Sequence, residues 1–294
     1  MLIVEGPSGN GVGRALALRL GCKFTQSIHT LFPDGESEVG IPGSAMGQDI
    51  FIVQTTYPEQ DKRIMELLFL ADQAKRMGAR SVGAIVPYLA YAREDKLFEE
   101  KNNAVSMQTL LKMFNTTGIS RLVTVAPHKE DSLDPFLGKI IIPDVFTHIA
   151  SSMKSKVRNP IVLAPDKGAI GIAKLFANVL GCDFTHLEKR RDRLTGKVSI
   201  LRGADRQLKG HDVVIVDDMI AVGSTMIQAA RFAKENGAKH VFAAAAHLLM
   251  LGDAAKKLKR AGVREVYGTN SIPNKDAKTI DVSAAIAESI HSFL

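Results

Sequence analysis

A short segment near the N-terminus occurs twice in this chain. Residues 20–25 read LGCKFT and residues 180–185 read LGCDFT, so five of six positions are identical. Two further pairs of segments match in the same order and at nearly the same separation: GQDIFIV at 47–53 with GHDVVIV at 210–216, and GARSV at 78–82 with GAKHV at 237–241. Ordered matches at a nearly constant separation indicate an internal duplication.

Strand-like apolar runs alternate with helix-like runs through both copies. This alternation predicts an α/β fold of two tandem domains, each a mainly parallel sheet flanked by helices. The second copy begins near the strand-like run at 161–163, so we expect an N-terminal domain over 1–147 and a C-terminal domain over 148–294. The length of 294 residues fits two domains of ordinary size.

Composition narrows the class of protein. Hydrophobic residues make up 46% and charged residues 23%, which is typical of a globular chain and excludes a disordered or collagen-like one. No apolar run approaches the ~18–20 residues that span a bilayer, so we expect a cytoplasmic protein without a membrane partner. The net charge of +7 is modest, and no zinc-finger spacing or RNA-binding aromatic motif accompanies it. We therefore expect no nucleic-acid partner.

The two copies differ after their central strands, and this difference locates the chemistry. The β-branched run at 213–216 is followed by Asp217, Asp218 and a loop of small residues at 221–225, whereas the first copy has QTTYP at 54–58. Ligands of parallel sheets bind beyond the carboxyl ends of the strands. Adjacent carboxylates suit vicinal hydroxyls, and a small-residue turn before a helix suits a phosphate. The pattern favours a sugar phosphate, although a solvated acid pair before a capped helix has the same sequence.

The segment VVIVDDMIAVGST at 213–225 resembles the phosphoribosyl-pyrophosphate loop of type I phosphoribosyltransferases and of ribose-phosphate pyrophosphokinases. The duplication favours the pyrophosphokinase family, whose members have two phosphoribosyltransferase-like domains. The resemblance implies transfer of a diphosphoryl group from Mg-ATP to ribose 5-phosphate, giving 5-phosphoribosyl 1-pyrophosphate and AMP. The implied ribose 5-phosphate ligands are Asp217, Asp218, Ala221, Val222, Gly223, Ser224 and Thr225.

The same resemblance implies a nucleotide site built from three segments. FPDGE at 32–36 is similar to the family's nucleotide hairpin, which reaches the ATP site of a neighbouring subunit and so implies a homodimer or a higher homo-oligomer. YLAYARED at 88–95 is similar to the family's arginine segment, and APH at 126–128 to its histidine segment. The implied ATP-binding residues are Phe32, Asp34, Glu36, Arg93, Glu94 and His128.

Metal and transition-state groups are implied in the same way. PDKG at 165–168 resembles the family's metal loop, so Asp166 and His128 are the implied Mg²⁺ ligands. The basic run KRRDRLTGK at 189–197 places Lys189 and Arg191 where the family has its catalytic cations. Positive donors held beside a transferring phosphoryl group stabilise its transition state. A solvated basic hairpin and a nucleic-acid patch are the alternative interpretations of this run.

Three residues depart from the family pattern. Glu94 stands in place of Gln, Ala126 in place of Asp, and Ala221 in place of the Asp of the sugar-phosphate loop. Two other functions therefore stay open from sequence. One is a phosphoribosyltransferase that consumes the same diphosphate sugar, and the other is a non-catalytic regulatory homologue.

Overall fold

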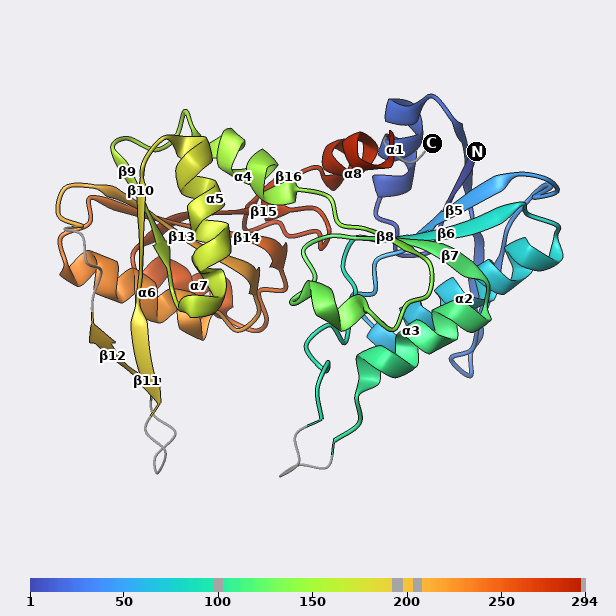
Figure 1. The fold of residues 1–294 in the computed structure, drawn as a ribbon, viewed down its shortest axis with the longest axis horizontal. Helices are drawn as coiled ribbons and strands as arrows, with labels where there is room; N and C mark the ends of the chain where they lie inside the picture. Colours follow the sequence, from blue (N-terminus) through green and yellow to red (C-terminus); the bar gives the residue numbers. More distant parts are fainter. Residues whose placement is uncertain (98–102, 192–197, 203–207, 292–294) are drawn as a thin grey trace. The chain divides into compact units, whose positions relative to one another are not determined.

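The computed structural model describes residues 1–97, 103–191, 198–202 and 208–291 (Figure 1). The chain forms two compact units: unit 1 comprises Met1–Asp144 with Asp281–Leu294, and unit 2 comprises Val145–Ile280. Each unit is an α/β layer structure in which helices flank a parallel sheet. This arrangement confirms the predicted fold class.

Unit 1 is built around a sheet with the strand order β2-β1-β5-β6-β7-β8, in which all neighbouring strands run parallel. Its elements are β1 (Leu2–Glu5), α1 (Val12–Leu20), β2 (Lys23–Gln26), β3 (Ile28–Leu31), β4 (Ser37–Gly40), β5 (Asp49–Val53), α2 (Gln60–Arg76), β6 (Ser81–Val86), α3 (Ser106–Thr116), β7 (Ile119–Thr124), η1 (Glu130–Leu133), β8 (Lys139–Ile141) and α8 (Val282–His291).

Unit 2 repeats this order as β10-β9-β13-β14-β15-β16, again with parallel neighbours. Its elements are α4 (Val145–Met153), β9 (Pro160–Ala164), η2 (Lys167–Ala169), α5 (Ile170–Leu180), β10 (Asp183–His186), β11 (Glu188–Arg191), β12 (Val198–Arg202), β13 (Asp212–Ile220), α6 (Ser224–Glu235), β14 (His240–Leu248), α7 (Ala254–Arg260), β15 (Val263–Thr269) and β16 (Lys278–Ile280).

The duplication extends to the strands outside the sheets. Each copy inserts an antiparallel hairpin between its second and third sheet strands, β3–β4 in unit 1 and β11–β12 in unit 2. The first hairpin carries the FPDGE turn, and the second carries the basic run. Two segments that the sequence singled out separately are therefore the same insertion in the two copies.

The central strands contain continuous apolar runs because helices cover both faces of each sheet. Residues 50–53 of β5 and 213–216 of β13 are fully or almost fully buried. Such continuous runs are expected in parallel sheets, where alternation with polar residues is not needed. The polar residues that follow each run thus mark the point where the buried strand reaches the ligand-binding edge of the sheet.

The C-terminal helix α8 packs against α1 of unit 1 (Figure 1). Arg19 donates from Nε to Ser283 Oγ over 2.9 Å and forms an ion pair with Asp281 at 3.5 Å. In sequence this helix belongs to the second copy, within the range 148–294. Among the helices in the described part of the chain, none combines the length and apolar character that crossing a bilayer requires.

Candidate active site

The acid pair lies at the carboxyl end of β13. The strand is buried up to Val216, and Asp217 and Asp218 are the first residues of β13 after that run to gain partial exposure. The backbone N–H of Asp218 donates to Asp217 Oδ1 over 3.0 Å, which fixes the orientation of the Asp217 carboxyl group. The structure thus places both carboxylates where the sequence predicted them.

The pKa of Asp217 is raised from 3.8 to about 7, mainly because the carboxyl group is buried. Repulsion from the Asp218 and Asp166 carboxylates raises it further. Asp166, from the loop after β9, is therefore close enough to affect the acid pair at the end of β13. Two acidic side chains at the end of β13 and one from the loop after the adjacent strand β9 thus lie near one another, and a cation or hydroxyl donors would relieve their repulsion.

The small-residue loop connects β13 to α6. Gly223 is the N-cap residue of α6 and has a left-handed φ of 75°, a conformation that favours glycine. Ser224, which begins the helix, and Val222 are exposed, while Ala221 and Thr225 are partly buried. Backbone N–H groups at a helix N-terminus are suited to an anion such as a phosphate.

A second segment, which the sequence did not indicate, forms backbone hydrogen bonds with this loop. The backbone N–H of Met250 donates to Ile220 O over 3.0 Å, and the N–H of Leu251 donates to Ala221 O over 3.0 Å. Met250 takes a left-handed φ of 48°, which is uncommon for a residue with a side chain. The connection after β14 thus contacts the first residues of the predicted phosphate loop through its backbone.

Asp166 begins a tight turn after β9. Its Oδ1 accepts a hydrogen bond from the N–H of Gly168 over 3.1 Å, and the turn leads through η2 into α5. Next to it in sequence, Lys167 lies 3.9 Å from Glu188, the first residue of β11, in a long and exposed ion pair. The hairpin that carries the basic run therefore starts beside the Asp166 turn.

Lys189 and Arg191 belong to β11, where they pair with Ile200 and Val198 of β12. For these two residues the structure describes the backbone, and their side chains lie outside the described part. Residues 192–197 of the basic run also lie outside the described residues. The catalytic role of both cations stays a prediction.

The FPDGE hairpin in unit 1 is a defined turn with exposed side chains. Phe32 N–H donates to Glu36 O and Gly35 N–H donates to Phe32 O, both over 2.9 Å. The Asp34 carboxylate accepts from Glu36 N–H over 3.0 Å, and Gly35 has a left-handed φ of 96°. Phe32 is 43% exposed, and Asp34 and Glu36 are exposed as well. An aromatic ring and two carboxylates are thus available to a ligand.

The arginine and histidine segments meet at the carboxyl ends of adjacent strands β6 and β7. Arg93, Glu94 and His128 are all exposed. Neighbouring residues join the two segments, because the Lys129 ammonium group donates to the Asp95 carboxylate over 3.2 Å. The Asp95 side chain is only 7% exposed. The structure therefore brings these two predicted nucleotide segments together.

The described residues contain no group of three or more His, Cys, Asp and Glu side chains that could hold a metal ion by themselves. Mg²⁺ is usually held by one or two carboxylates together with substrate phosphates and water. Asp166, Asp217 and Asp218 supply carboxylate oxygens at this edge of the sheet, and such oxygens are the ligand type that Mg²⁺ takes. The residues of unit 2 therefore fit a magnesium ion that completes its coordination with substrate oxygens.

Comparison with known proteins agrees with this geometry. Residues 1–118 match the model of the N-terminal domain of ribose phosphate pyrophosphokinase, and residues 205–293 match that of the phosphoribosyl synthetase-associated domain. The ribose-phosphate pyrophosphokinases of Sulfolobus acidocaldarius and Saccharolobus solfataricus are each 41% identical over 292 residues, 99% of this chain and 100% of the relative.

Among solved structures, the phosphoribosylpyrophosphate synthetase from Mycobacterium smegmatis is similar over 99% of this chain and 98% of its own, with a TM-score of 0.86 and 25% identity. The likeness spans both units. Together with the two family models and the full-length relatives, it shows that the chain belongs to the ribose-phosphate pyrophosphokinase family.

Proposed function

We propose that this chain transfers the diphosphoryl group of ATP to the 1-hydroxyl of ribose 5-phosphate, giving 5-phosphoribosyl 1-pyrophosphate and AMP. The observation that carries the proposal is the edge of unit 2, where the Asp217–Asp218 pair is followed by a left-handed glycine and a helix N-terminus. Family membership and the full-length relatives support the same reaction.

Two groups of residues bind ribose 5-phosphate, one at its ribose hydroxyls and one at its 5-phosphate. Asp217 and Asp218 accept hydrogen bonds from the ribose hydroxyls, and residues 221–225 donate backbone and hydroxyl hydrogen bonds to the 5-phosphate. Ala221 contributes no side-chain donor, so the loop depends on its backbone N–H groups and on the hydroxyls of Ser224 and Thr225. The buried carboxyl group of Asp217 provides the contact that is most sensitive to the state of ionisation.

ATP is bound by the three segments of unit 1. Phe32 stacks on the purine, with Asp34 and Glu36 beside it as acceptors for its amino group. Arg93 and His128 contact the phosphates, and a guanidinium group is well suited to paired hydrogen bonds with phosphate oxygens. Glu94 is an acceptor without N–H donors, so its contribution to nucleotide binding differs from that of the family's Gln.

Mg²⁺ is the proposed cofactor, with Asp166 and His128 as its protein ligands. The ion supplies charge neutralisation on the transferring phosphates when it is bound. Lys189 and Arg191 stabilise the negative charge of the diphosphoryl group as it moves to the sugar hydroxyl. No strong general base is needed, because phosphoryl transfer depends mainly on positioning and electrostatic stabilisation.

The proposed assembly is a homodimer or a higher homo-oligomer in which the hairpin of one subunit serves the nucleotide site of another. The exposed Phe32 ring on a projecting turn supports this proposal, because an apolar ring gains by burial against a partner or a ligand. Since ATP and ribose 5-phosphate are cytoplasmic metabolites, the cytoplasm is the proposed location.

The assignments are tested by measuring KM for each substrate and kcat in three variants. Phe32→Ala should raise KM for ATP and leave KM for ribose 5-phosphate unchanged. Thr225→Ala should do the reverse, and Lys189→Ala should lower kcat by a factor of about 10²–10³, typical for loss of one transition-state donor.

The same set distinguishes the remaining alternative of a non-catalytic regulator, which Ala126 and Ala221 favour. A regulator would produce no AMP in the wild type and would bind nucleotide equally well in the Lys189→Ala variant. Release of AMP that depends on ribose 5-phosphate and on Lys189 would exclude it.

A further inference from the structure

The strand register identifies which residues of unit 1 replace the acid pair of unit 2. In unit 1, Leu2 of β1 pairs with Ile50 of β5, and in unit 2, Ile161 of β9 pairs with Val213 of β13. Following both central strands to their carboxyl ends places Gln54 at the position of Asp217 and Thr55 at that of Asp218. Both are buried, so they cannot serve a ligand as the acid pair does.

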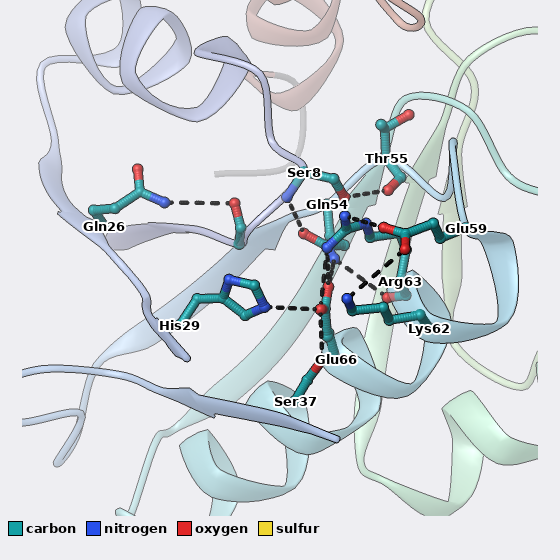
Figure 2. A network of polar contacts seen from close by, with 11 residues as sticks. Ser8, Gln26, His29, Ser37, Gln54, Thr55, Glu59, Lys62, Arg63 and Glu66 are labelled. Atoms are coloured by element: carbon teal, nitrogen blue, oxygen red, sulfur yellow. Dashed lines mark hydrogen bonds and ion pairs between the residues drawn. The ribbon is translucent and has the colours of Figure 1, made fainter. Parts of the chain in front are cut away.

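Gln54 leads instead to a buried carboxylate on α2 (Figure 2). Its Nε2 donates to Glu66 Oε2 over 3.0 Å, and its Oε1 accepts from Ser8 N–H over 3.0 Å. Glu66 is 0% exposed. Arg63 Nη1 donates to both of its oxygens, over 3.1 and 3.0 Å, and Arg63 Nη2 bonds Glu59 over 2.6 Å. The charge of Glu66 is thus compensated on the α2 side, as a buried charge must be.

The other side of Glu66 faces the hairpin. Ser37 Oγ of β4 donates to Glu66 Oε1 over 3.1 Å, and His29 Nε2 of β3 lies 3.2 Å from the same oxygen (Figure 2). His29 pairs with Val39 and Leu31 pairs with Ser37, so these residues share one face of the hairpin. One buried oxygen atom therefore holds both hairpin strands on α2.

In the described part of the chain, Glu66 is one of two polar contacts that join the hairpin to α2; in the other, Ile41 N–H, directly after β4, donates to Gln73 Oε1 over 2.9 Å. A two-stranded hairpin is at best marginally stable in water, and each strand here has four residues. Thr30 and Glu38 on the opposite face are exposed, and on the face toward α2 Ser37 is half-buried while His29 and Leu31 are exposed. The turn that carries Phe32, Asp34 and Glu36 therefore takes its position from the contacts of β3 and β4 with α2.

The adjacent residues of the same strand end hold the arginine segment. Tyr88 N–H donates to Thr55 Oγ1 over 3.1 Å, Thr56 Oγ1 donates to Tyr88 O over 2.7 Å, and Ala90 N–H donates to Thr56 Oγ1 over 2.7 Å. This connection ends three residues before Arg93. The segment 54–56 thus connects the hairpin, through Gln54 and Glu66, with the segment that leads to Arg93.

From this geometry we propose that Glu66, together with Gln54, is a positioning residue for the nucleotide. It holds the β3–β4 hairpin so that Phe32, Asp34 and Glu36 are pre-organised for ATP. The inference rests on the proposed function of the hairpin as a nucleotide-binding element. The positions that bind the sugar in the second copy therefore support nucleotide binding in the first copy.

The test removes the two hairpin side chains that contact Glu66. The contacts among Arg63, Glu66 and Gln54 stay in place. The variant is the double substitution Ser37→Ala with His29→Ala. Its matched control is Thr30→Ala with Glu38→Ala, a directly opposed pair on the exposed face of the same hairpin. For each protein KM for ATP, KM for ribose 5-phosphate, kcat and the melting temperature are measured at saturating Mg²⁺.

We expect KM for ATP to rise about tenfold in the Ser37/His29 variant, because both hairpin contacts with the Glu66 carboxylate are lost; a tenfold change corresponds to about 1.4 kcal/mol. KM for ribose 5-phosphate should stay within twofold. The control should match the wild type in all four quantities. Ser37→Ala alone should raise KM for ATP by a smaller factor, with a melting temperature close to that of the wild type.

An unchanged KM for ATP in the double variant would overturn the inference, as would an equal rise in KM for both substrates. Phe32→Ala separates this result from failure of the proposed function. If Phe32→Ala raises KM for ATP and the Ser37/His29 variant does not, the hairpin binds nucleotide without the Glu66 anchor. If neither variant changes KM for ATP, the nucleotide role of the hairpin itself is wrong.

Discussion

Replacing Asp217 by Asn should stabilise the substrate-free protein and abolish sugar binding. The Asp217 carboxyl group is buried beside Asp218 and Asp166, which raises its pKa from 3.8 to about 7. At pH 8 the folded protein must therefore carry an unfavourable buried charge. The amide of Asn removes this charge and can still accept the Asp218 N–H hydrogen bond through its oxygen.

The expected gain in the free energy of unfolding follows from the difference between the folded and unfolded pKa of Asp217. At about 1.4 kcal/mol per pKa unit, the full change from 3.8 to about 7 corresponds to roughly 4 kcal/mol. The side chain keeps some contact with solvent, so we expect about half of this value, ~2 kcal/mol. For a domain of this size, that raises the melting temperature by about 5 °C.

The sign of the pH dependence is fixed by the direction of the shift. Because the folded pKa is raised, the protonated group contributes stability that is fully present below 3.8 and is lost as the pH rises through about 7. The advantage of Asp217→Asn over the wild type should therefore be largest at pH 8 and should mostly disappear at pH 4.5.

The assay is thermal unfolding of the wild type and the variant at both pH values, without Mg²⁺ or substrates. Asp276→Asn, at an exposed position of unit 2, is the control and should change little at either pH. Addition of ribose 5-phosphate with Mg²⁺ should raise the melting temperature of the wild type and not that of Asp217→Asn. An equal gain at both pH values, or a loss of stability at pH 8, would refute the electrostatic explanation.

Three further predictions concern other parts of the site. Gly223→Ala forces a side chain into a left-handed φ, which costs roughly 1 kcal/mol, and should raise KM for ribose 5-phosphate about fivefold; an unchanged KM would show that the loop does not need this conformation. Asp95→Asn removes the negative charge that pairs with the Lys129 ammonium group and should raise KM for ATP several-fold without changing KM for ribose 5-phosphate. Equal effects on both KM values would contradict the local role. Phe32→Ala and Lys189→Ala subunits can be co-refolded in equal amounts and their activity measured at low ATP. If the hairpin serves the neighbouring subunit of a symmetric dimer, about a quarter of the sites should be wild-type. No gain in activity over the separate variants would place both groups in one subunit's site.

Much of the fold could be predicted because the chain repeats itself. Matching segments at nearly constant separation required the same strand order twice, and both sheets have it. The packing of α8 on α1 could not be predicted in this way. It depends on long-range contacts of Arg19 with Ser283 and Asp281, and no local sequence pattern in either segment predicts these contacts.

The acid pair could be located from sequence because a β-branched run predicts a buried strand and the following polar residues mark its carboxyl end. The raised pKa of Asp217 could not, since it depends on the burial of the carboxyl group and on its distance from Asp166 in a different loop. The support from Met250 and Leu251 also escaped prediction, because it is made by backbone groups that carry no sequence signal.

The sequence around Glu66 carries a weak signal of a buried polar contact. Glu66 lies on α2 between the buried residues Ile64 and Leu67, three residues after Arg63. A carboxylate within an apolar stretch indicates a buried polar contact when an arginine precedes it by about one helical turn. Its partners on the hairpin, Ser37 and His29, lie 29 and 37 residues earlier in the chain, and only the folded structure brings them together.

In the proposed reaction both terminal phosphates of ATP move to the sugar as one unit. ATP labelled at the β-phosphate, incubated with the protein, Mg²⁺ and ribose 5-phosphate, distinguishes this transfer from others. We expect the label in the sugar product and unlabelled AMP in equal amount. Label that remains in ADP, or AMP released without ribose 5-phosphate, would show that the diphosphoryl group is not transferred.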